Sequence, residues 1–181
     1  MRYNKKLLAY TIGGVLFVSV LGTLLHFAYE WSGGNRIVAL FTPVNESTWE
    51  HMKLLFFPML VYILFEYFQL KEDFPGILCG GFTGILVGTI LIPLLFYGYT
   101  GILGRNFTAA DIAIYYISVI IGFIVSYYLA DECDQKIYEM AVSGIILLLA
   151  IAFMVFTFHP PDGRIFMDPL KNNIETSDTG K

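Results

Sequence analysis

The chain has 181 residues, of which 56% are hydrophobic and 14% are charged, and its formal net charge is -4. Soluble domains are on average about half apolar and about one quarter charged, so this composition does not fit a soluble domain. The mild negative charge and the lack of a basic stripe also exclude nucleic acid as an expected partner.

The apolar residues form long runs that short polar breaks separate. About 20 such residues are needed to cross a hydrocarbon core that is roughly 30 Å thick. Strands of a membrane barrel would alternate apolar and polar residues over about ten positions, and the runs show no such alternation. We therefore predict an all-α integral membrane protein, a bundle of about five transmembrane helices within residues 1–159. The expected helices cover residues 7–28, 47–70, 75–99, 108–130 and 137–158, and a polar C-terminal tail covers residues 160–181.

Residue types that open helices support two of these boundaries. Ser47 is followed three residues later by Glu50, and Thr108 is followed at the same spacing by Asp111. This spacing is typical of a capping box, in which the two side chains accept hydrogen bonds from free amides at a helix start. We therefore expect both pairs to begin helices.

Glycines recur every four residues in the third expected helix. They are Gly76, Gly80, Gly84 and Gly88. A helix face without side chains allows a neighbouring helix to approach closely, so this pattern predicts a packing seam. The same face offers a surface for oligomer formation, and the alternative is backbone that is exposed to a permeating ligand.

Basic residues before the first helix indicate the orientation of the chain. Arg2, Lys5 and Lys6 precede it, which favours a cytoplasmic N-terminus. The whole count is nearly even, with five basic residues at the N-terminal end of the bundle and six at the other. On this orientation Cys79 and Cys133 lie near the cytoplasmic face, where thiols stay reduced, so we expect both to be free.

All three histidines lie at one end of the expected bundle, together with several carboxylates. The chemistry-bearing residues at this non-cytoplasmic end are His26, Glu30, Glu46, Glu50, His51, Arg105, Asp111 and His159. The opposite end holds ordinary turn charges and lacks histidine. This asymmetry indicates a candidate site at the histidine end.

Imidazole and carboxylate groups one helical turn apart suit zinc or another divalent metal. His26 and Glu30 are four residues apart, so both project from the same face of a helix. With His159 or His51 they would supply three protein ligands and leave a fourth position for water. His26 is the strongest candidate because ionisable residues inside an apolar helix tend to face the bundle interior. The expected metal ligands are therefore His26, Glu30 and His159.

Other residues at this end suggest a substrate pocket beside the metal. Glu50 is the candidate general base for an attacking water molecule. Arg105 suits a phosphate or carboxylate of the substrate, because guanidinium groups bind such anions in a bidentate manner. Glu46, His51, Arg105 and Trp49 are thus the expected ligand-binding residues.

Each of these residues also has a purely structural interpretation. Glu46 and Glu50 suit the start of a helix, where they would satisfy amides and the helix dipole. Trp49 suits an aromatic belt at the membrane surface. His159 precedes two prolines and suits a helix end in water, and His51 lies about 100° around the helix from Glu50, so these two cannot both point squarely at one small site.

Two stretches of the sequence carry a family resemblance. Residues His26–Gly33, Phe41 and Val44–Leu54 resemble an uncharacterised family of small bacterial multi-pass membrane proteins, and so do Pro160–Pro161 and Phe166–Pro169 near the C-terminus. The resemblance covers most of the chain. It implies a bacterial plasma membrane as the setting, and it implies no catalytic activity, since the family has none assigned.

Three functions fit these observations. The first is a pocket at the histidine end that binds a divalent metal or a small polar ligand or lipid, with hydrolysis of a membrane-embedded or periplasmic substrate as its use. The second is a small-solute or ion carrier, or its membrane subunit, although transporters usually place their site near the bilayer midplane. The third is an assembly or scaffold protein of the membrane.

Overall fold

The computed structural model describes residues 4–133 and 136–168 of the chain, and it is helical throughout this part. Its elements are α1 (Lys5–Trp31), α2 (Arg36–Ala39), α3 (Thr48–Leu70), α4 (Ile77–Leu103), α5 (Thr108–Leu129), α6 (Lys136–Phe158) and the 3-10 helix η1 (Arg164–Phe166). Five of these helices, α1, α3, α4, α5 and α6, are long and apolar enough to cross a membrane. The predicted fold class is therefore confirmed, and the five predicted ranges match these helices closely.

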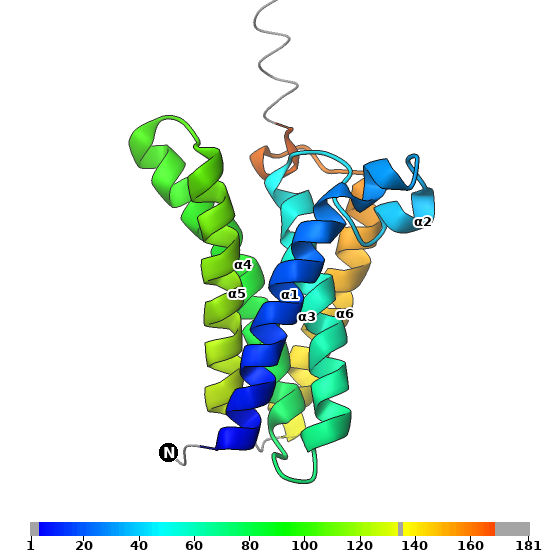
Figure 1. Ribbon diagram of the computed structural model, residues 1–181. Coiled ribbons are helices and arrows are strands. Elements are labelled where there is room, and N and C mark those ends of the chain that lie inside the picture. The colour runs from blue at the N-terminus through cyan, green and yellow to red at the C-terminus, as the bar shows by residue number, and fades with distance from the viewer. Residues whose placement is uncertain (1–3, 134–135, 169–181) are drawn as a thin grey trace, which may run out of the picture.

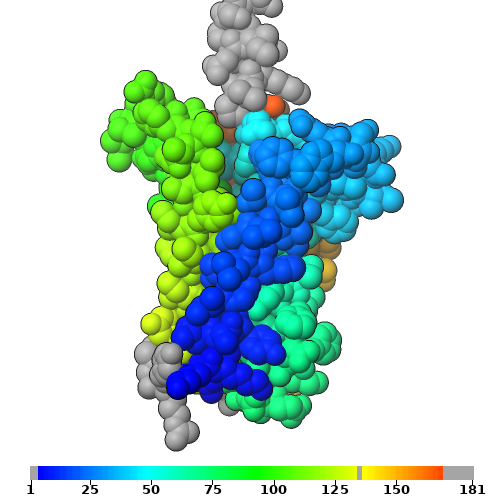
Figure 2. Space-filling model, in the orientation of Figure 1, coloured from blue at the N-terminus to red at the C-terminus, as the bar shows by residue number. Residues whose placement is uncertain are grey.

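The five long helices run in alternating directions (Figure 1). The start of α1 and the α3–α4 turn lie at one end, which we call the proximal end. The segment α2, the start of α3, the α4–α5 turn and η1 lie at the other, which we call the distal end. Towards the distal end the α4–α5 hairpin leans away from α1 and α3, and the space-filling view shows a notch between them (Figure 2).

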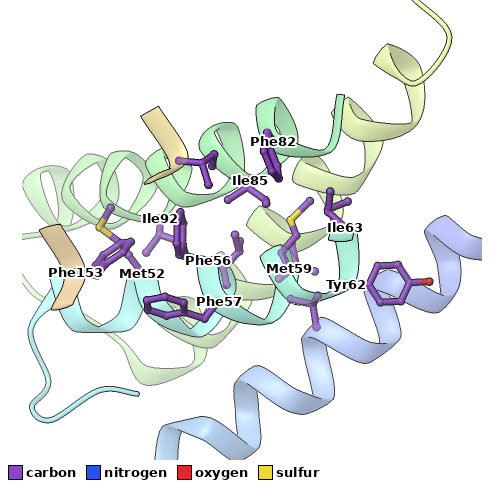
Figure 3. Packing of buried hydrophobic residues seen from close by; sticks show 14 of the residues in the cluster. Met52, Phe56, Phe57, Met59, Tyr62, Ile63, Phe82, Ile85, Ile92 and Phe153 are labelled. Carbon is purple, nitrogen blue, oxygen red and sulfur yellow. The ribbon is translucent and has the colours of Figure 1, made fainter. Parts of the chain in front are cut away.

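Helix α3 lies at the centre of the bundle and buries the largest share of its membrane-spanning window. Its side chains Phe56, Met59 and Ile63 belong to the main apolar core, together with Phe82 and Ile85 from α4 (Figure 3). These aromatic and branched side chains are buried in contact with one another, and the dispersion attraction between them stabilises the bundle. Helix α3 is thus the element against which the other helices are placed.

The glycine face of α4 packs directly on α5. A Cβ atom built at Gly84 would lie 2.3 Å from the carbonyl oxygen of Gly122, and one built at Gly76 would lie 2.7 Å from that of Ala130. The backbones of the two helices are therefore close enough to exclude any side chain, and the predicted packing seam is confirmed. Helix α5 of the same chain thus covers this glycine face.

The helix starts confirm one of the two predicted caps. The Ser47 hydroxyl accepts a hydrogen bond from the backbone amide of Glu50 at 3.4 Å and caps α3, but the reciprocal half of the box is missing, because the Ser47 amide donates to Asn45 and not to Glu50. The cap at α5 is wrong, since the capping position belongs to Phe107 and Asp111 instead accepts hydrogen bonds from Tyr99 and Asn106. That carboxylate is thereby turned away from the amides of its own helix.

The expectation of free thiols is also wrong. Cys79, near the start of α4, and Cys133, after α5, form a disulfide with their Cα atoms 6.0 Å apart. The seam brings these two segments together, because the Gly76 amide donates to the carbonyl of Ala130 at 3.0 Å. The bond therefore fastens α4 to the end of α5 at the proximal end of the bundle.

Candidate functional site

Three of the residues singled out in the sequence come together at the distal end. They are His26 of α1, Glu46 of the α2–α3 loop and His51 in the first turns of α3, and each offers a ligand atom within 4.8 Å of the other two. The Nε2 atom of His51 lies 3.3 Å from one carboxylate oxygen of Glu46, and the Nε2 atom of His26 lies 4.0 Å from the other. The two imidazole rings face each other with their centroids 5.2 Å apart.

The start of α3 fixes the orientation of His51. Its Nδ1 atom lies 3.0 Å from the carbonyl oxygen of Ser47, the residue that caps the helix. With Nδ1–H donating to that carbonyl, Nε2 is the nitrogen that faces Glu46: in the charged ring it donates a proton to the carboxylate, and in the neutral ring it offers a lone pair to a metal. A backbone carbonyl that orients one imidazole nitrogen in this way is typical of histidines that bind metals through the other.

The loop that carries Glu46 is held from beneath by a buried ion pair. The Lys53 amine lies 2.7 Å from the carboxylate of Glu50, and the exposed fractions of the two side chains are 0% and 3%. Lys53 also donates to the carbonyls of Ala39 and Thr42, and the Glu50 carboxylate accepts from the backbone amide of Val44. The pair thus fastens the α2–α3 segment to α3 and sets the position from which Glu46 reaches the histidines.

The histidines act on Glu46 electrostatically. Its hydrogen bond with His51 is the main cause that lowers the pKa of the Glu46 carboxyl, and the nearby charges of His51 and His26 lower it further against the opposing effect of partial burial. Glu46 is therefore an ionised, acceptor-only group at neutral pH. A carboxylate next to two imidazoles is a donor set that zinc and related divalent metals accept.

His26 has a nitrogen that is left without a partner. Its Nδ1 atom is buried and makes no hydrogen bond to any residue in the described part of the chain. Buried polar nitrogens are usually paired, so this orphaned atom points to a ligand or an ordered water molecule at the site. Nε2, which faces Glu46, is the nitrogen that His26 offers to the donor set, and Nδ1 is left for a water molecule or a further ligand.

A pocket of about 540 Å³ opens beside this cluster, between α1 and α3 on one side and α4 and α5 on the other. It corresponds to the notch between the two halves of the bundle (Figure 2). Its polar lining includes Thr108, Asp111 and Asn106 in addition to the three clustered residues. Its apolar lining includes Leu54 and Ile92, which lie further from the distal end along their helices.

The remaining predicted site residues lie elsewhere. Glu50 is held by Lys53 and is not part of the pocket lining. Trp49 is buried against Phe153, Phe156 and Phe166 instead of lying in an exposed belt. Among the residues outside the cluster, Arg105 is exposed over the ring of Phe107, and Glu30 and His159 are exposed near the ends of α1 and α6.

Sequence reasoning also missed several residues that define the site. Lys53 is one of the six basic residues that the sequence assigns to the distal end, and its position three residues after Glu50 in an apolar run is a signal for a buried pair. Asp111 was assigned to a helix cap, and its place at the histidine end was the available signal for the pocket. Nothing in the sequence distinguishes Tyr115, which lines the pocket and donates to the carbonyl of Val18.

Five helices that can span a membrane, with a histidine and carboxylate cluster beside a pocket at one end, define the class of this protein. The chain belongs to DUF6512, a family of unknown function, whose family model matches residues 1–174. The resemblance to an uncharacterised family is thereby confirmed. Neither the curated proteins nor the solved structures contain a match to this chain.

Proposed function

We propose that this protein is a multi-pass membrane protein that binds one divalent metal of the zinc type through His26, Glu46 and His51. The observation that carries the proposal is the spacing of the three donor groups. Ligand atoms about 2.0 to 2.1 Å from a tetrahedral zinc lie about 3.3 to 3.4 Å apart. His51 meets this spacing at 3.3 Å from one Glu46 oxygen, His26 lies 4.0 Å from the other oxygen, and the three ligand atoms lie within 4.8 Å of one another, so side-chain movements of this order would bring them to one centre.

Three protein ligands are typical of zinc sites that keep a position open for water, and such a site serves hydrolysis. The adjoining pocket combines a polar end at the cluster with apolar walls from membrane-spanning helices. This combination suits an amphiphilic molecule whose polar group lies at the metal and whose chain lies in the bilayer. We propose hydrolysis of such a substrate as the use of the site.

Within this proposal the candidate general base is Asp111 in place of Glu50. Asp111 lines the pocket, whereas Glu50 already neutralises a buried lysine. The hydroxyl of Tyr99 and the amide of Asn106 hold the Asp111 carboxylate in a fixed orientation. A positioned carboxylate of this kind is what proton transfer from a water molecule requires.

Metal content of the purified protein tests the binding step. The wild-type chain and the variants His26→Ala, Glu46→Gln and His51→Ala are loaded with zinc, freed of excess metal and assayed by atomic emission. We expect one zinc per wild-type chain and an affinity lower by about 10- to 100-fold or more in each variant, since even residues that only orient metal ligands have effects of this size. Cobalt substitution would in addition report the coordination number from its visible spectrum.

His159→Ala and Glu30→Gln are the matched controls, because they remove the same chemical groups from exposed positions outside the cluster. Both controls should bind zinc as the wild type does. The proposal is overturned if the wild-type chain retains no zinc, or if the controls lose as much affinity as the three site variants.

For the orientation we propose a cytoplasmic N-terminus in a bacterial plasma membrane, with the metal site at the opposite face. The burial of Lys53 supports this orientation, because it removes one basic residue from the loops at the distal end. Lys5, Lys6 and Lys71 remain at the proximal end, where they are exposed.

A further inference from the structure

Helix α3 holds a second buried carboxyl group far from the pocket. Glu66 lies 15 residues after His51, which corresponds to about 22 Å along the helix axis. Its exposed fraction is 1%, and its Oε2 atom has no hydrogen-bond partner in the described part of the chain. Nothing in the metal site or its pocket makes use of this group.

The surroundings of Glu66 are apolar. It lies on α3 between Ile63 of the main core and Leu70 of a smaller proximal cluster, which also contains Leu7, Phe74 and Ile77. Glu66 forms no salt bridge with any of the described residues. The one ion pair seen among them at the proximal end joins Lys6 to Asp73 at 2.6 Å. Among the described residues no cation pairs with Glu66, and Lys71, the next cation along the chain, is exposed and lies over the ring of Tyr67.

The titratable groups near Glu66 are tyrosines. Tyr62 lies one turn before it on α3, and its hydroxyl donates to the backbone carbonyl of Tyr10 on α1 at 2.6 Å. Tyr10, Tyr67 of α3 and Tyr127 of α5 pack on the proximal cluster, and the Tyr127 hydroxyl accepts from the backbone amide of Asn4. From α4 the cluster receives only the apolar Ile77, and Cys79 of that helix is disulfide-bonded.

An ionised carboxylate in such a place would be an unpaired charge in an apolar bundle, which is strongly unfavourable. A protonated carboxyl group avoids this cost. A hard metal cation is a poorer occupant, because it needs several oxygen ligands and the buried helix carbonyls here are engaged in backbone hydrogen bonds. We propose that Glu66 is a proton-binding site inside the bundle and that it holds its proton at neutral pH.

The position of Glu66 suggests how the proton exchanges with water. Glu66 lies about one helical turn before the end of α3, and the proximal cluster separates it from that end of the bundle. Opening of this cluster would therefore expose the carboxyl group to the proximal side only, because the main core lies between it and the distal pocket. Glu66 would then take up and release protons on the side that we assign to the cytoplasm.

Labelling with a lipid-soluble carbodiimide tests the proposal on the full chain in its membrane. Such a reagent takes the proton of a neutral carboxyl group onto one of its nitrogens while the carboxyl oxygen bonds to its central carbon, and the adduct rearranges to a stable acylurea. We expect an adduct on Glu66 at neutral pH, its loss at alkaline pH and its loss in Glu66→Gln. A water-soluble carbodiimide should label the exposed Glu72 instead.

Glu72→Gln is the matched control, because it removes an exposed carboxylate near the same end of the bundle and should leave the Glu66 adduct unchanged. Infrared absorption gives a second measurement that needs no reagent, since the wild type should show a carboxylic acid C=O band that Glu66→Gln lacks. The proposal is refuted if Glu66 stays unlabelled at every pH, if both reagents label it equally, or if the two infrared spectra agree in this band.

Discussion

A substitution of Gly84 tests the close approach of α4 and α5. In Gly84→Ala the new Cβ atom would lie 2.3 Å from the carbonyl oxygen of Gly122, whereas ordinary contacts begin at 3.4 Å. The helices must therefore separate locally by about 1.1 Å, and the obstacle is backbone that cannot rotate away.

The expected loss of stability follows from two opposing effects. Overpacking of a tight core costs up to about 3 kcal/mol. The higher helix propensity of alanine returns about 1 kcal/mol. The net loss of about 2 kcal/mol should lower the Tm by roughly 4 to 8 °C in a chain of this size.

Thermal unfolding of the purified protein in one detergent measures this difference. Gly98→Ala is the matched control, because Gly98 lies in the same helix and an added Cβ would meet no atom within 4 Å. Its Tm should equal or exceed that of the wild type. The packing argument is wrong if Gly84→Ala and Gly98→Ala unfold at the same temperature.

Three further predictions follow from the buried pair, the metal cluster and the disulfide. Lys53→Met should destabilise the chain by about 3 to 5 kcal/mol, because it leaves Glu50 charged and buried. In thermal unfolding the double variant with Glu50→Gln should recover most of this loss. A single variant as stable as the wild type would contradict the role of the pair. Because its contact with His51 lowers the pKa of Glu46, the pair stabilises the metal-free chain above the usual carboxyl range and loses its effect as the pH falls through the lowered pKa. Glu46→Gln should therefore lower the Tm at neutral pH and lose this effect in acid, and an equal Tm difference at both pH values would argue against the ion pair. Mass spectrometry of the purified chain without reductant should find Cys79 and Cys133 joined, and Cys79→Ser should lower the Tm because the bond that fastens α4 to the end of α5 is lost; free thiols at both positions in the purified wild type would contradict the bond.

The membrane helices were predictable because the length and the apolar composition of a segment are enough to identify a membrane-spanning helix. A run of about 20 apolar residues has few alternatives, since backbone groups in lipid must be satisfied within the segment. The seam was predictable for a related reason, because glycines at every fourth position produce a bare face whatever the partner helix is. The start of α1 at Lys5 was missed by two residues, because the Asn4 side chain caps the amides of Lys6 and Leu7.

The candidate site was predictable only as a set of residues at one end. Helix direction places His26, Glu46 and His51 on one end of the bundle, and also Glu30 and His159, but it does not say which side chains converge. That choice depends on how α1 and α3 are rotated about their axes, and this rotation follows from contacts between helices.

The buried pair shows a second limit of the sequence. From the sequence, Glu50 fits three roles equally well, namely a helix cap, a catalytic base and an ion-pair partner. Only the burial of Lys53 beside it shows that it is an ion-pair partner. The disulfide was missed for the opposite reason. A reducing compartment predicts free thiols, whereas the predicted topology places Cys79 and Cys133 near the same end of the bundle, where they can meet.

The composition of α3 has a consequence for how the chain enters the membrane. This central helix holds Glu50, Lys53 and Glu66, and charged residues near the middle of a lone helix oppose insertion by about 2.5 to 3.5 kcal/mol each, less towards its ends. The charges of Glu50 and Lys53 compensate each other and are completed by the α2–α3 loop and by Thr157 of α6, which is synthesised after α3, whereas Glu66 is proposed to be neutral. Biogenesis should therefore hold α3 at the insertion machinery until later helices arrive, so that the element at the centre of the finished bundle is among the last to be released into lipid.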